Sequence, residues 1–231
     1  FPIITKDIIK ENYYDFIPVN LKKINGVKEG QTGGTTGNIL LKRTDAITRS
    51  YTWGAYKRFE DWMGFKTGDK ALMLMGGHVI HKHSLESVIH DIIYKKINKI
   101  KNCIVFNPYD TEKEVVEKII ATILSQDIKL IRGYSQYLYY LCCIIKEKGI
   151  MCKVPIITTT AEPLMQEHRD LFASVLGAES YDQYGCGEIG GIAFECGSHE
   201  GLHITEENVI VEANENNDLI CTDLNNYSMP F

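Results

Sequence analysis

The sequence lacks several features that would mark it for a particular class of function. No apolar run reaches the roughly 18 residues that a membrane-spanning helix needs, and no signal peptide opens the chain. The 7 cysteines, an odd number spread along the chain, favour free thiols over a disulfide framework and predict a cytoplasmic protein. Basic residues are not in excess either. With 25 Lys and Arg against 30 Asp and Glu, the net charge of -5 argues against a general nucleic-acid binder.

What is present is the composition of an ordinary globular protein, with 44% hydrophobic and 24% charged residues among 231. That length fits one large domain or two small ones, and the chain has no internal repeat or low-complexity segment. It begins at Phe1 rather than Met and ends at Phe231 in an apolar stretch, so we expect a piece of a longer protein. Nothing in the sequence indicates an oligomeric state.

The central part of the chain alternates short apolar runs, which predict strands, with apolar residues at helical spacing, which predict helices. This alternation occurs four times and predicts an α/β fold with a mostly parallel sheet flanked by helices. The expected strands cover residues 71–77, 103–106, 129–132, 154–160 and 180–184. The expected helices cover 85–97 behind a Ser84 cap, a segment opened by a Thr111–Glu114 capping box, 135–148, and a segment with Pro163 in its first turn.

The two ends of the chain differ from this centre. Residues 1–30 predict a helix and a linker. Short strand-like runs at 202–204, 208–212 and 219–222 follow the centre, and Asn216-Asn217-Asp218 between the last two predicts a hairpin turn. We therefore predict an N-terminal helix and linker over 1–30, an α/β core over 31–190, and a β-rich appendage over 191–231.

Two glycine-rich segments could hold phosphate groups. In Gln31-Thr32-Gly33-Gly34-Thr35-Thr36-Gly37, backbone N–H groups and hydroxyls could surround an anion, although a solvated turn is the alternative. Residues 185–190 have the G-x-G-x-x-G spacing of dinucleotide-binding loops, which leaves an NAD-binding oxidoreductase open as an alternative. That fingerprint belongs to the first strand–helix turn of its unit, whereas these residues come last in the series.

A third pattern has the spacing of metal ligands. Cys196, His199 and His203 could bind zinc, with Cys186 or Cys221 as a fourth ligand after folding. The alternative is a buried free cysteine beside solvated histidines.

Three collinear motifs resemble those of the adenylate-forming superfamily of acyl- and aryl-CoA ligases. They are the Thr- and Gly-rich residues 32–37, the run Thr158-Thr159-Thr160-Ala161-Glu162, and the run Tyr184-Gly185-Cys186-Gly187-Glu188. Within the superfamily the chain resembles phenylacetate–CoA ligase-like and capsular polysaccharide biosynthesis proteins. Residues 130–135, Glu195-Cys196 with the following Gly201-Leu202-His203, and the run from Thr222-Asp223-Leu224 to Met229-Pro230 carry that finer resemblance. It covers nearly the whole chain and implies the central part of the large N-terminal domain, with residues 31–190 as a nucleotide-binding core.

The resemblance implies an ATP-dependent activation of a small carboxylic acid, which yields an acyl-adenylate that usually passes to a thiol such as coenzyme A. It also assigns roles to residues. The β- and γ-phosphates would be held by Thr32, Gly33, Gly34, Thr35, Thr36 and Gly37. Glu188 would bind Mg²⁺ and act in catalysis, and the adenine and ribose would be contacted by Ala161, Glu162, Asp182, Tyr184 and Gly185.

The sequence departs from the resembled pattern at two places. Gly187 stands where the motif usually has Thr, and the phosphate loop continues into Asn38 and Ile39 instead of Pro and Lys, with Lys42 slightly late. These departures leave open a non-catalytic nucleotide-binding protein of surface-polysaccharide biosynthesis. The family's ribose-binding Asp and its C-terminal domain with a catalytic Lys would lie beyond Phe231, so this stretch alone is expected to be nearly inactive. The acyl substrate and the thiol acceptor are not readable from the sequence.

Overall fold

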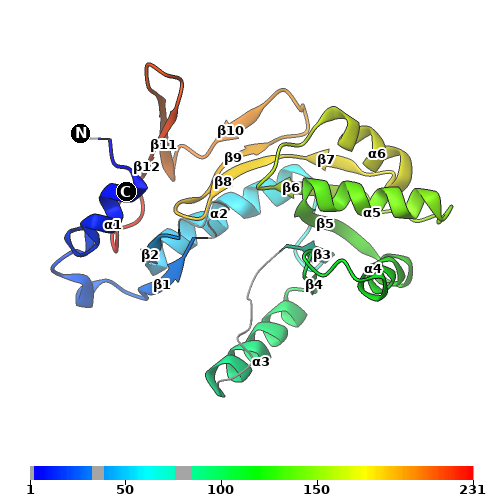
Figure 1. Cartoon of the computed structure of the whole chain (residues 1–231), viewed down its shortest axis with the longest axis horizontal. Helices are drawn as coiled ribbons and strands as arrows, with labels where there is room; N and C mark the ends of the chain where they lie inside the picture. Colours follow the sequence, from blue (N-terminus) through cyan, green and yellow to red (C-terminus); the bar gives the residue numbers. More distant parts are fainter. Residues whose placement is uncertain (1–2, 33–38, 76–84, 231) are drawn as a thin grey trace. The chain divides into compact units, whose positions relative to one another are not determined.

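The computed structural model describes the backbone of residues 3–32, 39–75 and 85–230, and in the last range the side chains from residue 92 onward (Figure 1). The chain divides into two compact units. Unit 1 comprises Phe1–Phe59, Tyr184–Phe194 and Gly201–Phe231, and unit 2 comprises Glu60–Gln183 and Glu195–Glu200. The three domains expected from the sequence remain a prediction.

Unit 2 is built on a five-stranded sheet with the order β4-β3-β5-β6-β7, and each neighbouring pair of strands is parallel. The strands are β3 (Lys70–Leu74), β4 (Cys103–Phe106), β5 (Ile128–Tyr134), β6 (Ile156–Thr160) and β7 (Glu179–Tyr181). The predicted α/β fold with a mostly parallel sheet is confirmed. Ligands of such sheets bind outside the carboxyl ends of the strands, where the loops after β5, β6 and β7 begin.

Helices α3 (Leu85–Ile100), α4 (Lys113–Ser125), α5 (Ser135–Glu147) and α6 (Gln166–Leu176) follow these strands (Figure 1). The apolar faces of α4, α5 and α6 share one buried core with β3, β5 and β6, which includes Ile119, Ile131, Leu141 and Phe172. Burial of this continuous apolar face stabilises unit 2. The predicted apolar face of α3 is less covered, since about half of each of the Ile92, Ile93 and Ile97 side chains is exposed.

Two predicted helix starts are wrong. Helix α4 begins only at Lys113, so Thr111 lies too far upstream to be its N-cap and the expected capping box is not formed. Helix α6 begins at Gln166, so Pro163 precedes the helix instead of occupying its first turn. One of the residues of α6 itself caps its start. His168 Nδ1 accepts a hydrogen bond at 3.4 Å from the backbone N–H of Met165, the residue directly before the helix. The expected cap Ser84 lies outside the described residues.

The remaining elements belong mainly to unit 1. Its N-terminal part contains α1 (Lys6–Glu11), η1 (Tyr13–Phe16), η2 (Leu21–Lys23), β1 (Lys28–Gln31), β2 (Leu41–Thr44) and α2 (Ala46–Trp62). Its later part contains β8 (Gln183–Cys186), β9 (Gly190–Glu195), β10 (Leu202–Ile204), β11 (Val209–Ala213) and β12 (Leu219–Asp223). Strands β1 and β2 are antiparallel and bracket the predicted phosphate loop.

The β-rich C-terminal part is confirmed as predicted. Strands β8, β9 and β10 form one small sheet, and β11 pairs antiparallel with β12 around the expected hairpin turn. Asn217 in that turn has φ 62°, a left-handed conformation that Asn tolerates better than most residues. In the part of the chain that the structure describes, no helix is both long enough and apolar enough to cross a membrane.

Candidate functional site

Asp182 lies at the carboxyl end of the sheet of unit 2, directly after β7. Its Oδ1 accepts hydrogen bonds from the Thr159 hydroxyl at 3.3 Å and from the backbone N–H of Gln183 at 2.8 Å. Burial raises the pKa of the Asp182 carboxyl, and these two donors partly oppose that rise. The side chain is therefore held in one direction at the sheet edge where α/β proteins bind ligands.

Ala161 and Glu162 follow β6, the neighbouring strand in the sheet. Ala161 has φ 67°, a left-handed conformation that costs energy for a residue with a Cβ atom and that recurs at functional sites. Glu162 Oε2 accepts a hydrogen bond at 2.8 Å from the backbone N–H of Gln136, in the first turn of α5. This carboxylate thus caps the N-terminus of α5.

Behind Asp182 lies a network that the sequence did not reveal as functional. Glu195, at the end of β9, has a side chain that is only 4% exposed. Arg169 Nη2 donates to its two carboxylate oxygens at 2.9 and 3.0 Å, and the backbone N–H of Asp182 donates to Oε2 at 2.6 Å. His199 Nδ1 lies 3.1 Å from Glu195 Oε1. The one sequence feature that hints at this network is a charged residue, Glu195, directly after the apolar run 192–194.

The same network bears on the predicted zinc ligands. The second ring nitrogen of His199, Nε2, lies 3.1 Å from Glu179 Oε1, so two carboxylates hold the imidazole. Cys196 Sγ is hydrogen-bonded to Ser198 Oγ at 3.0 Å. Among the side chains that the structure describes, those of residues 3–32, 39–75 and 92–230, no group of three or more His, Cys, Asp or Glu is placed to hold a metal ion. The structure therefore does not gather Cys196, His199 and His203 into a zinc site.

Unit 1 holds the predicted magnesium ligand. Glu188 follows β8, and its Oε1 lies 2.7 Å from Lys6 Nζ of α1 in an ion pair. The Glu188 side chain is 15% exposed and that of Lys6 is 48% exposed. Burial by itself raises the pKa of the Glu188 carboxyl, but the Lys6 ammonium, the backbone N–H of Glu188 and the Cys186 thiol together lower it, so the net pKa lies below its usual value. The carboxylate is ionised and carries the charge that a cation would meet.

Lys42 on β2, the lysine that lies slightly late after the predicted phosphate loop, extends to the same motif. Its ammonium donates a hydrogen bond to the backbone carbonyl of Gly187. Burial lowers the pKa of Lys42, while the neighbouring Cys186, Glu188 and Asp223 oppose that effect. The cation is therefore partly desolvated, and the strand that follows the phosphate loop is fixed to the motif that carries Glu188.

Glycine at position 187 leaves room for the Thr32 side chain. A Cβ atom at Gly187 would lie 3.2 Å from Thr32 Cβ and 3.3 Å from Thr32 Cγ2, so the buried Thr32 fills this space. Thr32 also closes the base of the predicted phosphate loop, because its N–H donates to Leu40 O at 2.9 Å and its hydroxyl accepts from Leu40 N at 3.1 Å. The other predicted phosphate ligands, residues 33–37, lie outside the described residues.

The dinucleotide-binding interpretation of residues 185–190 is wrong. They run from β8 through a turn into β9, a neighbouring strand of the same small sheet, whereas the fingerprint requires a helix after the glycines. Gly185 is needed for packing, since a Cβ atom there would lie 2.2 Å from the carbonyl oxygen of Gly190.

Tyr184, the predicted neighbour of the adenine and ribose, is half exposed on β8.

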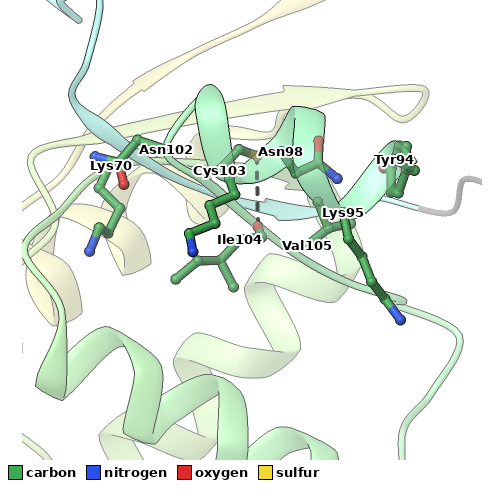
Figure 2. A pocket seen from close by; sticks show the side chains of 9 residues that line it. Lys70, Tyr94, Lys95, Asn98, Asn102, Cys103, Ile104 and Val105 are labelled. Atoms are coloured by element: carbon green, nitrogen blue, oxygen red, sulfur yellow. Dashed lines mark hydrogen bonds between the residues drawn. The ribbon is translucent and has the colours of Figure 1, made fainter. Parts of the chain in front are cut away.

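A cavity of about 460 Å³ lies in unit 2 between the C-terminal half of α3 and strands β3 and β4 (Figure 2). It shares no residue with the predicted site. Its lining consists of Lys70, Tyr94, Lys95, Asn98, Lys99, Asn102, Cys103, Ile104 and Val105. Lys70 is held by Gln126 Oε1 at 2.6 Å, and the Cys103 thiol approaches the Ile104 carbonyl at 3.9 Å.

No family model and no curated protein match the chain. Solved structures do. A 2-hydroxyisobutyryl-CoA ligase in an open conformation, in complex with 2-HIB-AMP and CoA, matches with a TM-score of 0.72 and 13% identity over 100% of this chain and 52% of that chain. An acyl-CoA synthetase (AMP-forming)/AMP-acid ligase II-like protein from Dyadobacter fermentans matches with a TM-score of 0.55 and 11% identity over 100% of this chain and 61% of that one.

ATP-bound MatB from Rhodopseudomonas palustris matches with a TM-score of 0.50 and 14% identity over 85% of this chain and 39% of that chain. This chain thus spans about half the length of the 2-hydroxyisobutyryl-CoA ligase structure that it matches. At such low identity the likeness is one of fold. The chain has the α/β fold of part of the large domain of adenylate-forming acyl-CoA ligases.

Proposed function

We propose that the protein belongs to an ATP-dependent ligase that activates a small carboxylic acid as an acyl-adenylate and passes the acyl group to a thiol such as coenzyme A. The observation that carries this proposal is the meeting of two predicted motifs in unit 1. Thr32 at the base of the Thr- and Gly-rich loop packs against Gly187, and Lys42 just after that loop donates to the Gly187 carbonyl. Phosphate donors and a candidate cation ligand are thereby supported by the same small group of residues.

The reaction requires the carboxylate of the substrate to attack the α-phosphorus of ATP. A bond forms between the carboxylate oxygen and phosphorus, the bond from phosphorus to the bridging oxygen breaks, and pyrophosphate leaves with the electron pair. Both reactants are negatively charged, so the protein must supply oriented donors. Thr32 and the amides and hydroxyls of residues 33–37 would hold the β- and γ-phosphates, and Lys42, whose ammonium has two further N–H donors, adds positive charge nearby.

The donor set of unit 1 fits Mg²⁺. Proteins bind this ion through one or two carboxylates, while substrate phosphates and water complete its shell, and Glu188 offers one ionised carboxylate. When bound, Mg²⁺ would neutralise charge on the phosphates. Lys6 now neutralises Glu188 at Oε1. A cation at Glu188 would therefore share the carboxylate with this ammonium or take its place.

The adenine would be recognised in unit 2. Ala161 and Glu162 after β6 and Asp182 after β7 stand at the carboxyl ends of neighbouring strands, the edge where such sheets bind ligands. The Asp182 carboxylate would accept a hydrogen bond from the adenine amino group.

The finer assignment to the phenylacetate–CoA ligase-like and capsular polysaccharide branch is also a proposal. It is supported by the sequence of residues 130–135 and by Glu195-Cys196.

Direct support for the general activity would come from exchange of labelled pyrophosphate into ATP by the full-length protein, assayed across aryl and short acyl acids. We expect exchange that depends on the acid and falls at least about 100-fold in Glu188→Gln.

Full exchange in Glu188→Gln would remove Glu188 from the mechanism. ATP binding without exchange for any acid would instead favour the non-catalytic nucleotide-binding protein that the Gly187 and phosphate-loop departures allow.

A further inference from the structure

Glu195 is a buried carboxylate for which the proposed reaction has no direct use. It ends a strand whose preceding residues, 192–194, are buried and apolar, a setting in which an unpaired charge is strongly unfavourable. The charge is compensated by Arg169, by the backbone N–H of Asp182 and by His199. Of these partners, only Asp182 is a candidate nucleotide ligand.

The contact between Glu195 and Asp182 involves both peptide groups. Asp182 N–H donates to Glu195 Oε2 at 2.6 Å, a short, charge-assisted hydrogen bond, and Glu195 N–H donates to Asp182 O at 3.0 Å. The Asp182 side chain is then directed by Thr159 and Gln183, which both donate to Oδ1. The main chain of Asp182 is thus fixed by Glu195, and its carboxylate is aimed by other residues.

This network has two roles that can be tested separately, holding α6 to β7 and fixing the main chain of Asp182. Arg169 Nη1 also donates to the Ser180 carbonyl at 2.6 Å, and so connects α6 to β7 without Glu195. A change at Arg169 that keeps its positive charge would weaken this connection while leaving a counter-ion for Glu195. A change at Glu195 would remove the acceptor of the Asp182 N–H.

We propose that Glu195 is a positioning residue for base selection: it fixes the Asp182 peptide so that the Asp182 carboxylate faces the 6-amino group of a purine nucleotide. This inference rests on the proposed function. A 6-oxo purine would place a carbonyl acceptor against that carboxylate, and a buried polar group left without its partner discriminates strongly between ligands. The site should therefore bind ATP in preference to GTP, and Glu195 should maintain that preference without touching either nucleotide.

The test measures dissociation constants for ATP and for GTP by titration calorimetry, using the full-length protein without a carboxylic acid. We expect Glu195→Ala to lower the preference for ATP over GTP about tenfold, since one hydrogen bond to a charged group is lost. Glu195→Gln should restore most of it, because its amide oxygen can accept from Asp182 N–H. The matched control Arg169→Lys should lower the melting temperature but keep the preference within about twofold of the wild-type value.

An unchanged preference in a folded Glu195→Ala variant overturns the inference, and so does an equal loss in Arg169→Lys. If circular dichroism shows that Glu195→Ala does not fold, Glu195→Asp decides. It keeps the charge but withdraws the acceptor by one methylene, so a lost preference supports the inference and an unchanged preference overturns it. A wild-type protein that binds no ATP would contradict the proposed function itself and overturn this inference with it.

Discussion

Two glutamates close together in the sequence, Glu188 and Glu195, have opposite surroundings. In unit 2, Glu195 is 4% exposed and receives hydrogen bonds from a guanidinium and a backbone N–H. In unit 1, Glu188 is 15% exposed and paired with Lys6, a long side chain that is itself 48% exposed. The first carboxylate is fixed on several sides, and the second is neutralised by a partner that solvent can reach.

This difference separates two uses of a carboxylate. A buried ion pair with several hydrogen bonds holds a geometry, because removing either partner leaves an uncompensated charge. A pair whose lysine is half exposed is partly screened by solvent and contributes less stability, so its carboxylate can exchange one cation for another at smaller cost. Glu195 is suited to positioning Asp182, and Glu188 is suited to meeting a metal ion.

The largest expected effect is the difference in stability between Glu195→Ala and Glu188→Ala. We expect the free energy of unfolding to fall by about 3–5 kcal/mol for Glu195→Ala, because Arg169 would be left partly buried without its counter-ion. For Glu188→Ala we expect a loss of less than about 1 kcal/mol. Urea denaturation of both variants measures the two values. Similar losses would mean that the two carboxylates do not differ in the way their surroundings indicate.

A second pair of variants compares the backbone beside each glutamate. Gly187→Ala would bring a Cβ atom to 3.2 Å from Thr32 Cβ, so we expect a destabilisation of about 1–3 kcal/mol from overpacking. Gly197→Ala is the matched control, because nothing described lies within 4 Å of a Cβ atom at that position. It should be neutral or stabilising by up to about 1 kcal/mol through the unfolded state. Thermal unfolding of the two variants gives the comparison, and a stable Gly187→Ala would refute the steric reason for glycine there.

Much of the fold was predictable because short-range patterns determine it. The strand at Cys103–Phe106 is an isolated apolar run, and the turn at 216–218 is dominated by residues that favour turns, so both were found where predicted. Helix starts were less predictable. Thr111 and Pro163 are good start signals, but in the folded chain the N-cap of α4 is Glu112, one residue after Thr111, and α6 begins only at Gln166.

The candidate site was predictable only as far as its motifs extend. Glu188 and Asp182 belong to one continuous stretch whose spacing identifies them as candidates. The sequence does not identify the residues that pair with the carboxylates. Lys6 meets Glu188, and Arg169 meets Glu195, only through tertiary folding, and no local periodicity links either pair. Because the partners decide whether a carboxylate is fixed or exchangeable, that distinction needed the structure.

A smaller effect is expected at the Lys6–Glu188 pair. Lys6→Ala removes the ammonium that pairs with Glu188, so Mn²⁺, a probe for Mg²⁺, should bind about two- to fivefold more tightly, matching the modest worth of an ion pair whose lysine is half exposed. Electron paramagnetic resonance of free Mn²⁺ measures this affinity. Lys10→Ala, from the last turn of the same short helix, is the control and should change it less. Weaker Mn²⁺ binding in Lys6→Ala would mean that Lys6 organises Glu188 for the metal.

The smallest effect concerns His199, through which the Glu195 network extends to the surface. Burial lowers the pKa of His199 and Arg169 acts in the same direction, but hydrogen bonds to Glu179 and Glu195 raise it above its usual value overall. The Tyr181 ring, 5.0 Å away between centroids, completes its surroundings. A histidine with a raised pKa stabilises the fold fully below its unfolded pKa of about 6.5, and this contribution is lost as the pH rises through the folded value.

His199→Gln should therefore be less stable than the wild type at pH 6 by about 0.5 kcal/mol, and this difference should shrink by pH 9. Urea denaturation at the two pH values tests the sign. Glu179→Gln should remove part of the same pH dependence, because Glu179 supplies one of the two carboxylates that hold the protonated ring. A stability difference that grows towards pH 9 would show that the neutral imidazole is the form the network prefers, and Glu195 would then be held chiefly by Arg169.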